Sequence, residues 1–232
     1  MSTVQSIIDG GFAKFAAARP ESFTAGSELI TEVGNALRAV FQVLARENPY
    51  IIGASAPINF DGAKWPRPTG CFRVIRVEAD SGTLAVPSIA AGTELTVVPM
   101  VDRYIAAGSP SLYEFAQAFY PVGQSVDPSG GTITIRYARA PQMPTTTGEA
   151  VDALFPSDFD DYLKWAVAAY LAQKDQRDLD TSTARANQAA VLAQIVEWAR
   201  SQTFSLVQRF PLTSPPLTST NNVAAQPLKG QQ

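Results

Sequence analysis

The stretch LFPSDFDDYLKWAVAAYLAQKDQRD, residues 154–178, decides the fold class of this 232-residue chain. From Ser157 onward its apolar residues recur at three- and four-residue spacing, as they do on the buried side of a helix. A second apolar row lies on another side of the same helix: Tyr162, Trp165 and Ala169. A helix that is apolar on most of its circumference is buried on two sides, by its own domain or by a neighbouring subunit. We expect the second row to serve self-assembly.

The sequence marks a boundary at both ends of this helix. Ser157 followed by Asp160 resembles a capping box. A charged turn at 175–180 separates the helix from a last one over about 181–201. The first half of that last helix is rich in alanine, which permits close approach of another helix.

The start of the chain predicts two further helices. Thr3 can cap a short helix over residues 4–18, which ends before Pro20. Thr24 can cap a longer helix with apolar residues at helical spacing, and Pro49 stops it.

From residue 50 to 144 the sequence changes to short β-branched runs separated by Gly, Pro and Ser. Three runs are predicted as strands: residues 72–77, 92–98 and 132–137. Residues 101–119 have a helical character that is broken at Gly108. A proline-containing stretch, 141–147, then leads into the helical part.

After Phe204 the chain is rich in Pro, Thr, Ser and Asn and cannot bury enough apolar surface to fold alone. We expect an extended C-terminal arm over residues 204–232 that orders on a partner. Its predicted partner-binding anchors are Phe204, Leu206, Phe210, Leu212 and Leu217.

The predicted fold class is therefore α+β, mainly α. Two N-terminal and two C-terminal helices form a four-helix core, which carries a central β-rich insert and the extended C-terminal arm. Residues 1–203 form one domain, and its parts are helices over 3–48 and 157–202 and the β-rich insert over 50–144.

Composition restricts the available chemistry. The chain has no histidine, which removes Ser-His-Asp and Cys-His nucleophiles and nearly all zinc sites. A formal net charge of -3 and a pI near 5.0 argue against a free-standing nucleic-acid binder. No run is long and apolar enough to cross a bilayer, and the N-terminus does not have the pattern of a signal peptide. We expect a soluble non-enzyme without cofactor or metal.

Each candidate chemical site has a simpler structural interpretation. Cys71, at the start of a strand, fits a small core residue better than a nucleophile. The acidic candidates, which suit a helix start better than catalysis, are Asp158, Asp160 and Asp161. The strand arginines, which suit a solvated sheet face better than a groove, are Arg73, Arg76, Arg136 and Arg139. The aromatic-rich residues 112–120 either pack over a sheet edge or make an intersubunit contact.

Three segments, taken in their order along the chain, carry a resemblance to a known protein family. The first is FTAGSELITEVGNALRAVFQVL, a helix after a threonine cap, and the second is GGTITIRYARAPQMP, a closing strand before the proline-containing stretch. The third runs from Phe155-Pro156 through Asp161-Tyr162-Leu163 to Tyr170-Leu171 and Lys174-Asp175. Their order and spacing resemble the head-to-tail adaptor (connector) proteins of tailed bacteriophages.

The resemblance implies a four-helix core that assembles as a ring of twelve subunits beneath the portal at the capsid vertex. The channel of the ring would pass genomic DNA without sequence-specific binding, and its lower face would receive the tail or a stopper or nozzle protein. The C-terminal arm would dock on the portal. The protein would lie in the virion neck, without membrane association, after synthesis in the cytoplasm of the bacterial host.

Other functions also fit the residues. A head-tail stopper or tail-completion protein belongs to the same class, although the helical flanks favour an adaptor. In a different class, the β-rich insert would be a carbohydrate- or ligand-binding module on a helical stalk, with a platform of Trp65, Tyr104, Tyr113 and Tyr120. A hydrolase based on the acidic residues is the weakest alternative.

Overall fold

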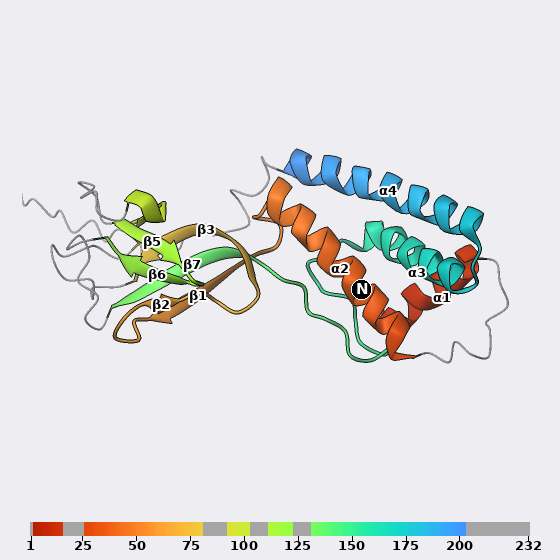
Figure 1. The fold of residues 1–232 in the computed structure, drawn as a ribbon, viewed down its shortest axis with the longest axis horizontal. Coiled ribbons are helices and arrows are strands. Elements are labelled where there is room, and N and C mark those ends of the chain that lie inside the picture. Colours follow the sequence, from red (N-terminus) through yellow and green to blue (C-terminus); the bar gives the residue numbers. More distant parts are fainter. Residues whose placement is uncertain (1, 16–25, 81–91, 103–110, 123–130, 203–232) are drawn as a thin grey trace, which may run out of the picture.

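The computed structural model describes residues 2–15, 26–80, 92–102, 111–122 and 131–202. Within these ranges the molecule is elongated and has two lobes, one helical and one built of strands (Figure 1). Each lobe has an apolar core of its own.

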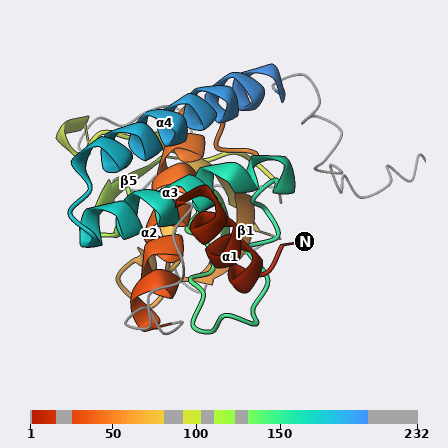
Figure 2. The same ribbon diagram turned by 90° about the vertical axis from the view of Figure 1, so that its right-hand side faces the viewer.

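Four helices form the helical lobe: α1 (Val4–Phe15), α2 (Ser27–Glu47), α3 (Asp160–Lys174) and α4 (Asp178–Ser201). Helix α3 packs against the other three, and α4 lies outermost in the end-on view of Figure 2. A single cluster of apolar side chains joins all four helices. Residues from both ends of the described chain therefore share one apolar core.

Two glycines in α1 let this helix approach α3 closely. A β carbon on Gly11 would lie 2.4 Å from Cγ1 of Val167, and one on Gly10 would lie 2.7 Å from Cδ of Lys164. Glycine has a low helix propensity, so the close contact accounts for two adjacent glycines inside a helix.

The helix-end predictions have mixed outcomes. The Thr3 cap is confirmed, because the Ser6 N–H donates to the Thr3 hydroxyl at 3.2 Å. Helix α2 ends at Glu47, as predicted from Pro49, but Thr24 lies outside the described residues. The capping box at Ser157 is wrong: Ser157–Phe159 form a 3-10 turn (η2), and no side chain caps α3.

The first sheet of the β lobe has three antiparallel strands in the order β1-β7-β3. These strands are β1 (Gly53–Asn59), β3 (Cys71–Ala79) and β7 (Thr132–Arg139). The register of β3 on β7 shifts twice, at Phe72 and at Ile75, so β3 carries two bulges. Pro57 is compatible with β1 because this strand lies at an edge.

The second sheet has four strands in the order β2-β6-β5-β4. They are β2 (Trp65–Pro66), β4 (Thr96–Val98), β5 (Ser111–Phe115) and β6 (Ala118–Pro121). Strand β4 pairs with β5 in parallel, and the other pairs are antiparallel. Ala116 and Gln117 link β5 to β6 with positive φ angles of 48° and 61°, the geometry of a two-residue hairpin turn.

The prediction of a mainly α protein, with a four-helix core and a β-rich insert, is wrong. Over the described residues the structure is α+β, with about 48% of them in helices and 25% in strands, and the seven strands described there form two sheets. Their apolar core is separate from the helical one and contains Trp65, Val77, Ala79, Leu95, Leu112, Phe119, Ile133 and Ile135. The predicted helical character of residues 101–119 is also wrong. In this stretch the described residues form the end of a short 3-10 turn (η1, Met100–Asp102), β5 and the start of β6.

Candidate interaction surfaces

Helix α3 is covered by the other helices of the same chain. Tyr162 and Ala169 keep only 4% and 7% of their surface exposed. Trp165 is partly buried and packs against the same core. We expected this helix to be buried by its own domain or by a neighbouring subunit. The other helices of its own lobe account for the burial of Tyr162 and Ala169. The role of the three residues in self-assembly stays a prediction, and Trp165 is the one that a second copy could still reach.

Lys14 of α1 holds Trp165 and Asp161 together at the surface of α3. Its ammonium lies 4.4 Å from the centre of the Trp165 ring and 3.1 Å from a carboxylate oxygen of Asp161. Burial alone would raise the pKa of Asp161, but hydrogen bonds from Lys14 and Lys164 outweigh it and lower that pKa. A hollow of about 120 Å³ between α1, α3 and α4 lies beside this group.

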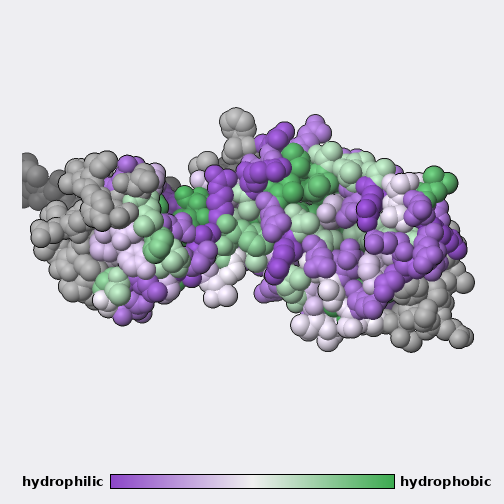
Figure 3. Space-filling model, viewed as in Figure 1, coloured by the Kyte–Doolittle hydropathy of each residue, from purple (hydrophilic) through white to green (hydrophobic). Residues whose placement is uncertain are grey.

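Helix α4 leaves its outer side open among the described residues. Its buried residues, Ala184, Ile195 and Ala199, face the helical core. Its exposed apolar residues are Leu179, which is 80% exposed, and the alanines Ala186, Ala189, Ala190 and Ala193. Figure 3 shows apolar surface along this helix. Residues 186–196 contain no charged side chain, which is unusual for three turns of a helix that contacts water.

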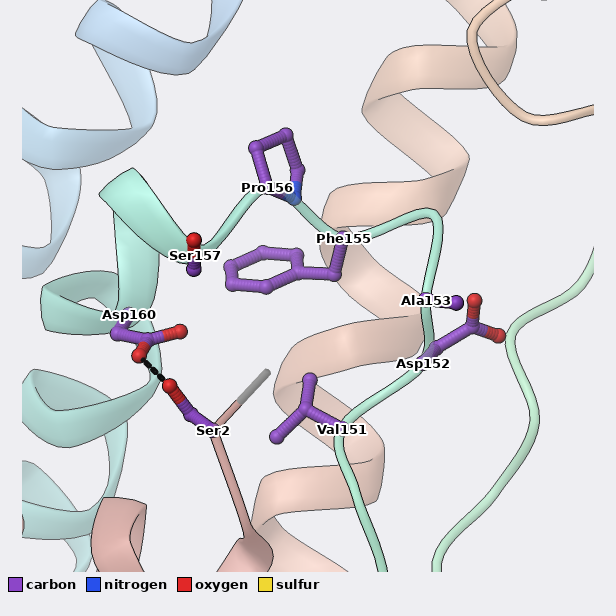
Figure 4. A pocket seen from close by; sticks show the side chains of 8 residues that line it. All are labelled: Ser2, Val151, Asp152, Ala153, Phe155, Pro156, Ser157 and Asp160. Atoms are coloured by element: carbon purple, nitrogen blue, oxygen red, sulfur yellow. Dashed lines mark hydrogen bonds between the residues drawn. The ribbon is translucent and has the colours of Figure 1, made fainter.

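A hollow of about 240 Å³ lies between the N-terminus, the segment before α3 and the first turn of α3. Ser2 and Asp160 hydrogen-bond across one side of it (Figure 4). Asp152 also lines the hollow, but its carboxylate points away from Asp160, and Phe155 lies between the two residues (Figure 4). Asp158 is exposed. The acidic residues near the start of α3 therefore do not converge on one reaction centre.

Asp152 is the centre of a buried clamp between the end of β7 and the segment before α3. Its side chain is fully covered and accepts two hydrogen bonds from Arg139, at 2.7 and 2.9 Å. The backbone N–H groups of Gln142 and Leu154 donate to the same carboxylate, at 2.7 and 2.9 Å. Burial alone would raise the pKa of Asp152, but these donors outweigh it and hold that pKa below its ordinary value.

The other strand arginines are also engaged with partners, and their expected solvated face is only partly realised. Arg76 and Arg136 both contact Glu78, whose side chain is 10% exposed. Arg73 donates to main-chain carbonyls at the end of α2. A groove of about 530 Å³ does exist beside β3, and Arg73 and Arg76 line it, as the alternative interpretation expected. Sequence reasoning missed Arg67, which lines one end of this groove.

The aromatic platform proposed for a carbohydrate-binding module does not form. Trp65 is fully buried, packs on Phe60 and donates its indole N–H to the carbonyl of Gly131 at 3.0 Å. Tyr113 and Tyr120 stack on each other across the β5–β6 pair, with ring centres 5.3 Å apart. Tyr104 lies outside the described residues. Because Trp65 contributes no surface, this alternative loses its central residue.

The five predicted anchors of the C-terminal arm lie outside the described residues, since the description ends at Gln202. Within the described ranges, no group of three or more acidic or cysteine side chains is placed to hold a metal ion. The four described helices also include none that is long and apolar enough to span a membrane.

Comparison with models of known protein families gave no match. A search of characterised protein sequences gave none either.

Proposed function

We propose that this protein is a structural subunit that assembles into a ring, and that the ring is a head-to-tail adaptor of a tailed bacteriophage. The order of the three segments that resemble this family supports the second part. The first part rests on one observation, the uncharged outer side of α4. The proposal places the protein in the virion neck, between the portal and the tail or a stopper protein.

The outer side of α4 has the properties of a helix-packing surface. Exposed helix positions in a soluble protein are usually charged or polar, which keeps the helix in water. Four exposed alanines and no charge over residues 186–196 remove that barrier. Small side chains also let a second helix reach the 8–10 Å axial distance of ordinary helix pairs. In a closed ring this face would meet a different face of the next subunit.

The charge balance of the chain supports passage of DNA through such a ring. A net charge of -3 gives little attraction to phosphates, whose contacts with Lys and Arg would retard a moving genome. The proposal therefore includes genomic DNA as cargo of the channel and not as a sequence-specific ligand.

The test combines oligomeric state with a single substitution on α4. Light scattering after size exclusion and negative-stain microscopy would be applied to the protein alone and mixed with its portal protein. We expect rings for the natural sequence, and loss of rings for Ala190→Arg with an unchanged melting temperature. Ala13→Arg is the matched control, because Ala13 is also an exposed alanine on a helix. A natural protein that stays monomeric with and without portal, or rings that tolerate Ala190→Arg, would refute the proposal.

A further inference from the structure

The groove in the β lobe lies between the edges of two strands. Its walls are consecutive residues, 72–77 on the β3 side and 94–97 on the β4 side. Successive side chains of a strand point to opposite faces. A groove over one face of a sheet would be lined by every second residue of a strand. This groove is lined by every residue of both runs, so it meets each strand at its edge, where the backbone hydrogen-bonding groups lie.

The two strands are joined at only one end of the groove. The Leu95 N–H donates to the Val77 carbonyl at 2.8 Å, and the Ala79 N–H donates to the Thr93 carbonyl at 2.9 Å. Within the described part of the chain, no ladder continues from there along residues 72–76 and 96–98. Among the described strands, β3 and β4 are the edge strands of their sheets, so the groove has the form of a place for one more strand.

Arg67 shows which way the free backbone groups of β3 point. Its guanidinium donates to the carbonyls of Cys71 and Phe72, at 3.1 and 3.0 Å, and lies 2.5 Å from the carboxylate of Glu114. This side chain thus takes the position of a neighbouring strand at the first two residues of β3. From Arg73 to Arg76 the described residues supply no such substitute on the groove side. A second backbone in extended form is the partner that such an edge recognises.

The chain leaves α4 beside this groove. The end of α4 is tied to the end of α2, because Asn48 donates to the Ala199 carbonyl at 2.9 Å and Arg200 pairs with Glu47 at 2.8 Å. Arg73, at the near end of the groove, donates to the Ala45 and Arg46 carbonyls in the same last turn of α2. In Figure 1 the end of α4 also lies toward the β lobe.

The eight residues after Gln202 have the composition of a strand. Residues 203–210 read TFSLVQRF, in which Phe204 and Leu206 alternate with polar or smaller residues. Pro211 then ends any ladder because it has no N–H to donate. At about 3.3 Å per residue, eight extended residues span roughly 26 Å, enough to cover the free edge of β3.

We infer that residues 203–210 bind in this groove of the same chain as an added strand, parallel to β3 and antiparallel to β4. The direction of the added strand follows because residues 203–210 enter the groove at the end where Arg73 lies. Arg209, the only charged residue in the segment, then reaches the end of the groove where the Glu94 side chain is 60% exposed. The arm beyond Pro211, with Leu212 and Leu217, remains for the partner that the sequence predicts for it. The inference itself does not depend on ring assembly.

Cysteine cross-linking in the full chain tests the contact. In a Cys71→Ser background, which removes the one natural cysteine, Val97→Cys is combined with Phe204→Cys, Leu206→Cys or Gln208→Cys. We expect at least one combination to form an intramolecular disulfide, seen as a monomer without free thiols, about tenfold faster than the control pair of Leu179→Cys with Leu206→Cys. No disulfide, or disulfide-linked dimers only, would overturn the inference, and dimers would indicate a second copy as the occupant.

Amide hydrogen exchange gives a test without introduced thiols. Leu206→Pro removes a backbone donor from the proposed strand, and Ser214→Pro makes the same change in the distal arm. We expect Leu206→Pro to raise the exchange rate of the amides at residues 73–76 several-fold, with the rest of the chain unchanged. Ser214→Pro should leave these amides as they are. Equal exchange in the natural protein and in Leu206→Pro would overturn the inference.

Discussion

Replacing Asp152 with alanine tests whether the clamp holds the segment before α3 in place. The change removes the acceptor of four hydrogen bonds, two from Arg139 and two from backbone N–H groups. It leaves the Arg139 guanidinium, whose side chain is 23% exposed, without its carboxylate. The Asp152 side chain is fully covered, so no water at its position can replace the hydrogen bonds that the carboxylate accepts.

The expected cost follows from the burial of this pair. Removing one partner of a buried ion pair costs about 3–5 kcal/mol, and the partial exposure of Arg139 places Asp152→Ala near the lower bound, at about 3 kcal/mol. For a chain of this size each 1 kcal/mol lowers the melting temperature by about 2–4 °C. We therefore expect a decrease of roughly 6–12 °C.

Thermal unfolding followed by circular dichroism measures this difference, and Asp161→Ala is the matched control. Asp161 also pairs with two cations, Lys14 and Lys164, but its side chain is 50% exposed. Exposed pairs contribute about 0–1 kcal/mol, so the control should lose less than about 4 °C. The double variant Asp152→Ala with Arg139→Met should recover part of the loss, because no buried charge is left unpaired.

The same clamp has a predictable pH dependence. The pKa of Asp152 is lower in the folded chain than in the unfolded chain, so its contribution is complete above the ordinary carboxyl pKa of about 3.9. The contribution is lost as the pH falls through the lower, folded pKa. We expect the gap in melting temperature between the natural protein and Asp152→Ala to be constant near neutral pH and to shrink below about pH 4. Equal melting of Asp152→Ala and Asp161→Ala at neutral pH would refute the reasoning.

Two other changes give clear expectations. Gly11→Ala should lower the melting temperature by several degrees, because the added β carbon meets the rigid Val167 side chain at 2.4 Å. Gly10→Ala should lower the melting temperature less, since Lys164 can move its flexible side chain outward. Equal melting temperatures of the two variants would contradict this account of the α1–α3 contact. Burial raises the pKa of the Cys71 thiol, so alkylation of Cys71 by iodoacetamide at pH 8 should be slow in the folded protein and at least tenfold faster in guanidinium chloride. Equal alkylation rates in both conditions would show that this thiol is accessible in the folded protein.

The helices could largely be predicted because their signals are local. Apolar residues at helical spacing indicated α2 and α3, and Pro49 stopped α2 where the structure ends it. The start of α3 was mispredicted because Ser157 and Asp160 form a local pattern that a 3-10 turn satisfies without a side-chain cap. The spacing of apolar residues also could not show which of the two apolar sides of α3 another helix of the same chain covers. Among the described residues the uncharged exposed run lies on α4, whereas Tyr162 and Ala169 of α3 are buried and Trp165 is partly buried.

The β lobe was harder to predict because tertiary pairing determines several of its strands. Strand β1 reads GASAPIN, with little β propensity, and it forms because β7 pairs with it over its whole length. The clamp could not be found for a similar reason. Arg139 and Asp152 lie thirteen residues apart in the sequence, and only the turn of the chain between the lobes brings them together. A buried aspartate shortly after a strand that ends in arginine is a signal too common to be decisive.

The turn between β5 and β6 has a consequence for engineering. Ala116 and Gln117 carry β carbons in the left-handed region, where each such residue costs about 1–2 kcal/mol relative to right-handed backbone. Asn-Gly is the pair that this turn geometry favours, so the natural sequence does not use the turn to specify how the hairpin aligns. That alignment comes from outside the loop, where the backbone N–H of Arg67 donates to the Gln117 carbonyl and its guanidinium contacts Glu114. A designer could therefore stabilise the second sheet by rewriting two loop residues without altering any side chain of its core.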